Sequence, residues 1–428
     1  MFASQINLLF LPGRNLCFLM RRRPITCLVC GLCLFVMAGG AAWYFWPIVY
    51  FWQAQRALSL DLLPEATAAI NSYLEHKAND PEGHLLASRI DRLRERYDDA
   101  EKHLDEYKRI EGSTEGSQLE WVLLRAMGGE LPEVESGLHY SLEKNDPHSD
   151  LILEALIYCY LKECRYQTAR YYLEKWLKKE PDNVRALSWR GWVREILDFK
   201  EEAKEDYIRV LQLSPKHQDT RIRYVHALLN DKNFPEALEH LKILERDHPD
   251  HAEVKYALAV CRANYGETEE AAKLLDELLV MQPNNARALH ERGRLIQAPL
   301  QQEKWFRQAI QIDPSFIEAR YSLWNCLKTQ NRSAEAESEK KKYDETVANW
   351  IKLKNIFDLL EKAPGNPDLL AEAGNLLLLR NSVVGQGFLY KALMISPNHK
   401  MAQEYLAKHH EKIGKKAPPR KTVPRSPN

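Results

Sequence analysis

The sequence predicts an all-α protein in which one N-terminal transmembrane helix precedes a long stack of helical hairpins. Three observations carry this prediction. After residue 53 the chain is rich in Ala, Leu, Glu, Lys and Arg, which are strong helix formers, and glycine is scarce, with 18 in 428 residues. Prolines in the middle of the chain recur at a fixed spacing. A stretch near the N-terminus is almost wholly apolar.

The apolar stretch is long enough to cross a bilayer. Residues 24–55 contain no charged side chain, and about 20 apolar residues span the hydrocarbon core of a membrane. Amphipathic rings of the kind that favour a membrane–water interface gather at its far end: Trp43, Tyr44, Trp46, Tyr50 and Trp52. The sequence therefore predicts a transmembrane helix over residues 24–52.

The flanking charges predict the orientation of this helix. Three arginines, Arg21 to Arg23, precede it, whereas Arg56 is the one basic residue close behind it. The positive-inside rule keeps residues 1–23 in the cytoplasm and exports the remainder, which in a bacterium places the repeats in the periplasm. The expected location is thus the inner membrane, as a single-pass protein. Met20 is an alternative start, which would leave residues 1–19 untranslated.

Two other interpretations of the N-terminal region stay open. A signal peptide could be cut after Ala38 or Gly40, but the run AAWYFWPIVYFW would then begin the mature protein with a large apolar patch, which argues against cleavage. An array of repeats that faces the cytoplasm is the second alternative.

The prolines define a repeat. Five of them are each 34 residues apart: Pro147, Pro181, Pro215, Pro249 and Pro283. Twelve residues before four of these prolines stands an alanine: Ala169, Ala203, Ala237 and Ala271. Four residues after each alanine comes a large apolar side chain: Leu173, Tyr207, Leu241 and Leu275. Such a period is typical of solenoids, because a single hairpin cannot bury its apolar face without neighbours.

This pattern resembles the tetratricopeptide repeat family over roughly residues 54–412. Gly191 and Gly293 match the small position of the family's first helix, and Tyr160 matches the aromatic position, whereas Arg194 and Arg262 depart from it. The resemblance implies a right-handed α-solenoid of about nine helix-turn-helix repeats. We expect the superhelix over residues 53–413 and a disordered, basic, proline-rich tail over 414–428. The regular repeats are expected at 150–183, 184–217, 218–251, 252–285, 286–316, 317–343 and 366–398.

No motif for catalysis or metal binding is present in the sequence. Three cysteines with motif-like spacing fall inside the apolar stretch without a partner ligand: Cys27, Cys30 and Cys33. Three others share one repeat position, which indicates packing: Cys159, Cys261 and Cys326. HExxH, the P-loop and GxGxxG are all absent. The sequence therefore predicts neither an enzyme nor a cofactor or metal site. Equal numbers of basic and acidic residues, 60 each, disfavour nucleic acid as a partner.

The family resemblance places partner-binding side chains on the concave face formed by the first helix of each repeat. We call the expected residues the groove residues: Tyr158, Arg185, Trp192, His226, Tyr256, Asn264, Arg287, His290, Arg294, Tyr321 and Asn325. Interleaved aromatic and arginine side chains are the types that anchor peptides. Some family members clamp a carboxylate with Lys and Asn at set positions, but Tyr256, Val260 and Tyr321 hold such positions here, so this clamp is not expected.

The sequence thus predicts a membrane-anchored scaffold in the cell envelope that binds a protein or peptide and has no small-molecule substrate. Two other functions stay open: a periplasmic chaperone or assembly factor with broad, weak binding, and an accessory subunit of an envelope enzyme.

Overall fold

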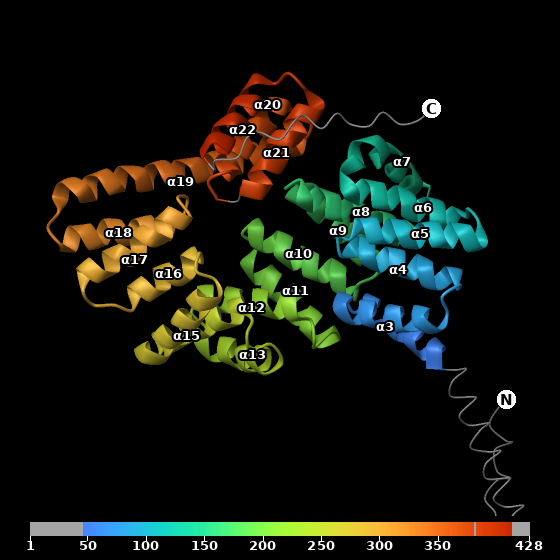
Figure 1. Ribbon diagram of the computed structural model, residues 1–428, viewed down its shortest axis with the longest axis horizontal. Helices are drawn as coiled ribbons and strands as arrows, with labels where there is room; N and C mark the ends of the chain where they lie inside the picture. The colour runs from blue at the N-terminus through green and yellow to red at the C-terminus, as the bar shows by residue number, and fades with distance from the viewer. Residues whose placement is uncertain (1–45, 145, 381, 413–428) are drawn as a thin grey trace, which may run out of the picture. The chain divides into compact units, whose positions relative to one another are not determined.

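A computed structural model describes residues 46–144, 146–380 and 382–412. Within these ranges the chain consists of helices joined by short turns, and no strand occurs there (Figure 1). The predicted all-α class is therefore confirmed. The described residues divide into two compact units, of which the first ends at Glu130 and the second begins at Leu131.

The first unit contains successive helices that pack on their neighbours along the chain. It begins, among the described residues, with a helix over 46–59. The helices that follow are α3 (Leu63–His76), α4 (Pro81–Leu93), α5 (Tyr97–Glu111), α6 (Glu115–Arg125) and the π-helical turn η1 (Ala126–Glu130). In that turn Gly129 adopts a φ of 113°, which interrupts the helical path.

The second unit contains a longer run of helices, most of which pair as hairpins. They are α7 (Leu131–Glu143), α8 (Ser149–Lys162), α9 (Tyr166–Lys179), α10 (Val184–Ile196), α11 (Lys200–Leu213), α12 (Gln218–Asn230), α13 (Phe234–Asp247), α14 (Ala252–Asn264), α15 (Thr268–Met281), α16 (Ala286–Arg294), α17 (Pro299–Ile312), α18 (Ile317–Thr329), α19 (Ser333–Lys362), α20 (Pro367–Leu377), α21 (Ser382–Ile395) and α22 (Lys400–Lys412).

Most of the predicted transmembrane helix, residues 24–52, lies outside the described residues, as do the N-terminal segment and the tail over 414–428. Among the helices that are described, none combines the length and the apolar character needed to span a bilayer. Residues 46–52 open the helix over 46–59, in which the Trp46 and Trp52 side chains are 56% and 57% exposed.

The prolines that recur every 34 residues mark where one hairpin ends and the next begins. After Pro181, Pro215, Pro249 and Pro283, the residue two places on is the N-cap of the following helix, and after Pro147 it is the next residue, His148. Asn183 and Asn285 each accept a hydrogen bond from a backbone N–H of the new helix at 3.0 Å, and the ring of His217 accepts one at 3.3 Å. Proline stops one helix, and the capping side chain satisfies a free N–H of the next.

The turn inside each hairpin repeats with the same period. Cys164, Asp198, Lys232 and Gly266 follow one another at 34 residues and have φ values of 57°, 68°, 61° and 80°. The N–H of the residue after each donates to a carbonyl five positions earlier at 2.8–3.0 Å, which is the Schellman way of ending a helix. Glycine adopts this conformation without steric cost, whereas the cysteine, the aspartate and the lysine adopt it at a steric cost.

The predicted packing positions are confirmed. The four repeat alanines are at most 1% exposed, as are the four large side chains that follow them. Cys159, Cys261 and Cys326 are also buried, at 0–5% exposure. The small position of the first helix is equally tight, since a Cβ at Gly191 would lie 2.6 Å from Cε1 of Tyr207, and one at Gly293 would lie 2.8 Å from Phe306.

Substitution of Gly191 by alanine should therefore destabilise the second unit. Tyr207 is fully buried and its hydroxyl donates to Glu195 at 2.8 Å, so the ring cannot move away without breaking that bond. We expect a loss of about 1–3 kcal/mol in the free energy of unfolding, measured by urea titration with circular dichroism. Gly137→Ala in α7 is the matched control, because nothing lies within 4 Å of its added Cβ. Equal effects of the two changes would contradict the tight contact.

Candidate binding pocket

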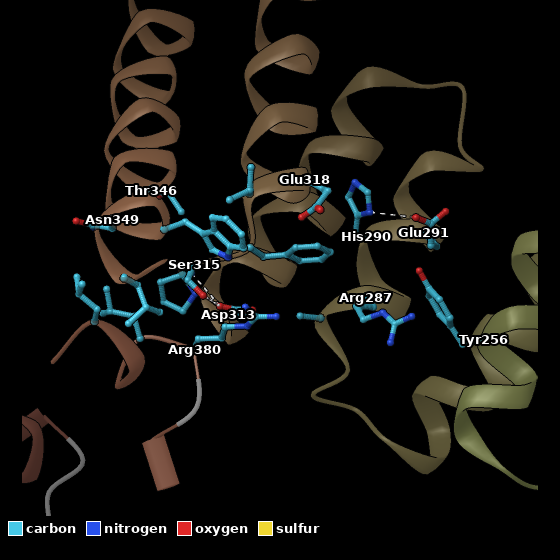
Figure 2. Close-up of a pocket in the computed structure, with 18 of the residues that line it drawn as sticks. Tyr256, Arg287, His290, Glu291, Asp313, Ser315, Glu318, Thr346, Asn349 and Arg380 are labelled. Carbon is cyan, nitrogen blue, oxygen red and sulfur yellow. Dashed lines mark hydrogen bonds and ion pairs between the residues drawn. The ribbon is translucent and has the colours of Figure 1, made fainter. Parts of the chain in front are cut away.

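A pocket of about 510 Å³ lies in the second unit. Its walls come from α12, α14, α16, α19 and α20 and from the turn before α18. Four groove residues line it: Tyr256, Arg287, His290 and Arg294. Figure 2 shows Tyr256 and Arg287 at one end of the pocket and Thr346 and Asn349 of α19 at the other.

At the first end, four side chains from three consecutive first helices form one network. The Arg287 guanidinium lies 4.0 Å from the centre of the Tyr256 ring and donates to Glu253 at 3.0 Å. Nε2 of His226 lies 3.0 Å from the same carboxylate. The network links α12, α14 and α16, so the Tyr256 and Arg287 side chains are held in place before any ligand arrives.

This network lowers the pKa of Glu253 to about 2. The hydrogen bond with His226 is the main cause, and the charges of Arg287 and His226 add to it, whereas partial burial acts in the opposite direction. Glu253 is therefore a fixed negative charge behind the pocket wall.

A second network fixes the middle of α16. His290 is buried, with Nδ1 3.2 Å from Glu291 and Nε2 2.9 Å from the Ser322 hydroxyl. Arg294 donates to the same Glu291 at 2.8 Å. Burial would raise the pKa of Glu291, but the hydrogen bond with His290 and the charge of Arg294 outweigh it and lower the pKa. The charge of Arg294 is thus already balanced within its own helix.

The opposite wall was not anticipated from the sequence. Trp350 and Leu353 of α19, and Leu379 and Arg380 after α20, line the pocket. Trp350 is 49% exposed and Leu379 42% exposed. Arg380 is exposed and takes part in no ion pair found among the described residues. The signal in the sequence was the unbroken helical pattern that became α19, but a repeat pattern predicts contacts between neighbours and does not reveal which distant repeats meet.

The structure does not bring the other seven groove residues to the pocket: Tyr158, Arg185, Trp192, His226, Asn264, Tyr321 and Asn325. Trp192 lies beside Arg223, with 5.0 Å from guanidinium to ring, and its ring meets that of Tyr166 at 6.3 Å. Tyr321 is 48% exposed and packs on Trp324. Asn264 bonds to a carbonyl of its own helix at 2.8 Å. Any binding role for these residues stays a prediction.

Two of the groove residues, Arg185 and His290, are buried, with 5% exposure each. Arg185 forms an ion pair with Glu154 of the preceding first helix, and Glu154 is 1% exposed. A buried charge without its partner is strongly destabilising, so each member of this pair requires the other. The pair therefore belongs to the packing of α8 on α10. His290 is buried in the same way but still lines the pocket.

The helical hairpins stack on one another, and small residues lie where two helices cross closely. This arrangement defines an α-solenoid. The family model described as tetratricopeptide repeat matches residues 201–259 and 232–295. Residues 201–295 therefore match the tetratricopeptide repeat, in agreement with the sequence pattern. The match includes α12 to α16 in full, and these helices supply the Tyr256 end of the pocket.

Similar proteins extend this finding little. Intraflagellar transport protein 70A of Danio rerio is 30% identical over 126 residues, which is 29% of this chain and 19% of that protein, so the match spans about a fifth of the relative's length. Among solved structures, MamA 41-end from Desulfovibrio magneticus RS-1 has 18% identity and a TM-score of 0.34, over 38% of this chain and 91% of that chain. The human IFIT1 dimer with m7Gppp-AAAA has 15% identity and a TM-score of 0.40, over 78% and 82%. Similarity at this level carries no information on ligands of this chain.

The network behind the pocket makes stability depend on pH in the acid range. The pKa of Glu253 is about 2 in the folded chain against 4.5 for an ordinary glutamate, so its stabilising contribution is present above about pH 4.5 and is lost as the pH falls towards 2. The urea midpoint of the wild type should drop more between pH 6 and pH 3 than that of Glu253→Gln. Glu337→Gln, on an exposed part of α19, is the control and should behave as wild type. Parallel curves for all three chains would refute the assignment.

Proposed function

We propose that this chain is a non-catalytic scaffold that holds an extended segment of a partner protein in the pocket of its second unit. The observation that carries the proposal is the composition of the pocket, where exposed apolar side chains on one wall face arginines and a tyrosine held in place on the other. Sites that anchor peptides typically contain a small number of aromatic and arginine side chains that are held in fixed positions in a recess.

The two walls suggest what the segment must carry. Trp350, Leu353 and Leu379 offer an apolar surface for a large side chain. Arg380 offers a charge without an ion pair among the described residues, which suits a carboxylate next to that side chain. Three arginines and three carboxylates line the pocket, so it has no strong field of one sign. This balance favours a peptide over the phosphate backbone of a nucleic acid.

The thiols of Cys261 and Cys326 are unsuited to covalent chemistry. Burial raises the pKa of Cys261 to about 11, and it also raises the pKa of Cys326. A thiol with a raised pKa is a poor nucleophile at neutral pH. Both cysteines pack in the repeat core, as the alanines do.

Peptide selection tests the proposal directly. Random 12-residue peptides displayed on phage should be enriched by the full chain in detergent for a large apolar residue near Asp or Glu. Binding of the enriched peptide, followed by fluorescence anisotropy, should weaken about ten-fold or more in Trp350→Ala. Ile351→Ala is the matched control, because Ile351 is 53% exposed on the same helix and does not line the pocket.

Two results would count against a dedicated pocket. Equal affinity of the Trp350→Ala and Ile351→Ala chains would place the binding elsewhere. Suppression of aggregation of several unrelated unfolded proteins, unaffected by Trp350→Ala, would favour the chaperone alternative.

We further propose that residues 24–52 anchor the scaffold in the inner membrane and that the repeats face the periplasm of a bacterial envelope. The support is the charge-free apolar run in the sequence and the arginines that precede it. The exposed rings of Trp46 and Trp52, with the Arg56 guanidinium 5.4 Å from the Trp52 ring, fit the membrane–water interface at the end of this anchor.

Fractionation and a reporter test this anchor. The full chain should stay with bacterial membranes through an alkaline carbonate wash and enter solution in detergent. Alkaline phosphatase fused after Asn428 should be active, because it folds with its disulfides outside the cytoplasm. Release by carbonate would exclude the anchor, and an inactive but intact fusion would reverse the orientation.

A further inference from the structure

Two parts of the second unit that are far apart in sequence touch each other. Repeats of a solenoid normally contact only the next repeat. Here the start of α9 contacts the end of α19, across 194 residues, and Lys391 of α21 pairs with Glu163, across 228 residues. The contact closes the chain between α9 and α21 into a loop. We call residues 163–168 together with Glu361 and Lys391 the latch.

Glu361 acts as the N-cap of a helix in another repeat. Its carboxylate accepts from the backbone N–H of Gln167 at 2.7 Å and from the hydroxyl of Thr168 at 2.7 Å. The residue at the N-cap position of α9, Arg165, makes no side-chain capping bond. The free N–H groups at the start of α9 thus obtain their acceptor, and a favourable negative charge, from α19.

The first turn of α9 is compatible with this outside acceptor. The second helices α11, α13 and α15 each carry one or two glutamates in the first turn, whereas α9, like α17 and α21, carries no acidic residue there. An acid of its own would repel Glu361. The first turn of α9 is therefore suited to the closed form of the loop.

The remaining latch contacts are partly exposed. The Glu163 and Lys391 side chains are 17% and 28% exposed. Cys164 packs against the apolar cluster of the C-terminal repeats, and burial raises the pKa of its thiol. The ion pair and the hydrogen bonds of Glu361 involve partly exposed charged groups, and such contacts contribute little each. The closed form is thus held by weak, salt-sensitive interactions.

The latch and the pocket belong to the same loop. Asn230 of α12 and Arg380 after α20 line one pocket although several repeats separate them. The charge of Arg380 also acts on the hydroxyl of Tyr166, which lies in the latch. Separation of α9 from α19 would therefore free the α19–α20 wall of the pocket to move.

We propose that the latch opens and closes reversibly and controls the entry of an extended partner segment into the pocket. With the latch closed, a long segment reaches the pocket only by threading through the loop. With the latch open, the segment enters from the side, and reclosure holds it. This regulation rests on the proposed function, whereas the opening itself can be measured without any ligand.

Pulsed alkylation of the full chain measures the opening. N-ethylmaleimide is added for short times, and mass spectrometry reads the labelling of Cys164 against that of Cys261, which is fully buried. Gln167→Glu gives α9 its own acid and repels Glu361, and Lys391→Gln removes the other ion pair. The double variant should label Cys164 about ten-fold faster with Cys261 unchanged. Lys352→Gln, which removes an ion pair between α19 and α20 outside the latch, should match the wild type.

Salt provides a second measurement on the unaltered chain. In 1 M sodium chloride the Debye length is about 3 Å, so labelling of Cys164 should again rise relative to Cys261. Unchanged Cys164 labelling in both experiments would overturn the latch, as would a parallel rise at Cys261, which signals unfolding.

A latch that opens as expected but leaves the association rate of the selected peptide unchanged would overturn its control of the pocket. Failure to select any peptide would bear on the proposed function and leave the alkylation result standing.

Discussion

The contact between the small residue of one helix and the large residue of its neighbour is the constraint on which the structure depends. Each hairpin exposes an apolar face that it cannot cover by itself, so the next hairpin must approach closely. The approach is close enough at Gly191 that a single added methyl group would meet the Tyr207 ring. With this distance fixed in every repeat, the first helices are held side by side, and the side chains between them have set positions.

The sequence predicted these packing positions because they repeat. The alanines, the large side chains after them and the prolines follow one period, and each has a single physical role that a residue type reveals. The turn inside each hairpin repeats as regularly in space, yet its left-handed residue is Cys164, Asp198, Lys232 or Gly266. No common residue type marks it, since hydrogen bonds of the turn impose the conformation on whatever residue stands there.

The binding site was less predictable, for a different reason. The family resemblance gives the place of a side chain on its helix but not what the neighbouring repeat puts against it. Arg185 meets Glu154 and is buried, whereas Arg287 meets Tyr256 and Glu253 at the edge of the pocket. Both arginines occupy the start of a first helix. Their environments differ because the residues one repeat earlier differ, and those pairs do not follow the period.

The features that depart from the repeat pattern come largely from one long helix. At 30 residues, α19 is about 45 Å long and exceeds the 14 residues of α9 or α11. Ala336 near its start is buried against α18, its middle supplies Trp350 to the pocket, and Ile356 and Leu360 near its end join the C-terminal core. The next residue, Glu361, reaches α9. A second helix of ordinary length would end before the pocket wall. The extension of α19 therefore provides both the pocket and the latch, in addition to the contacts between neighbouring repeats.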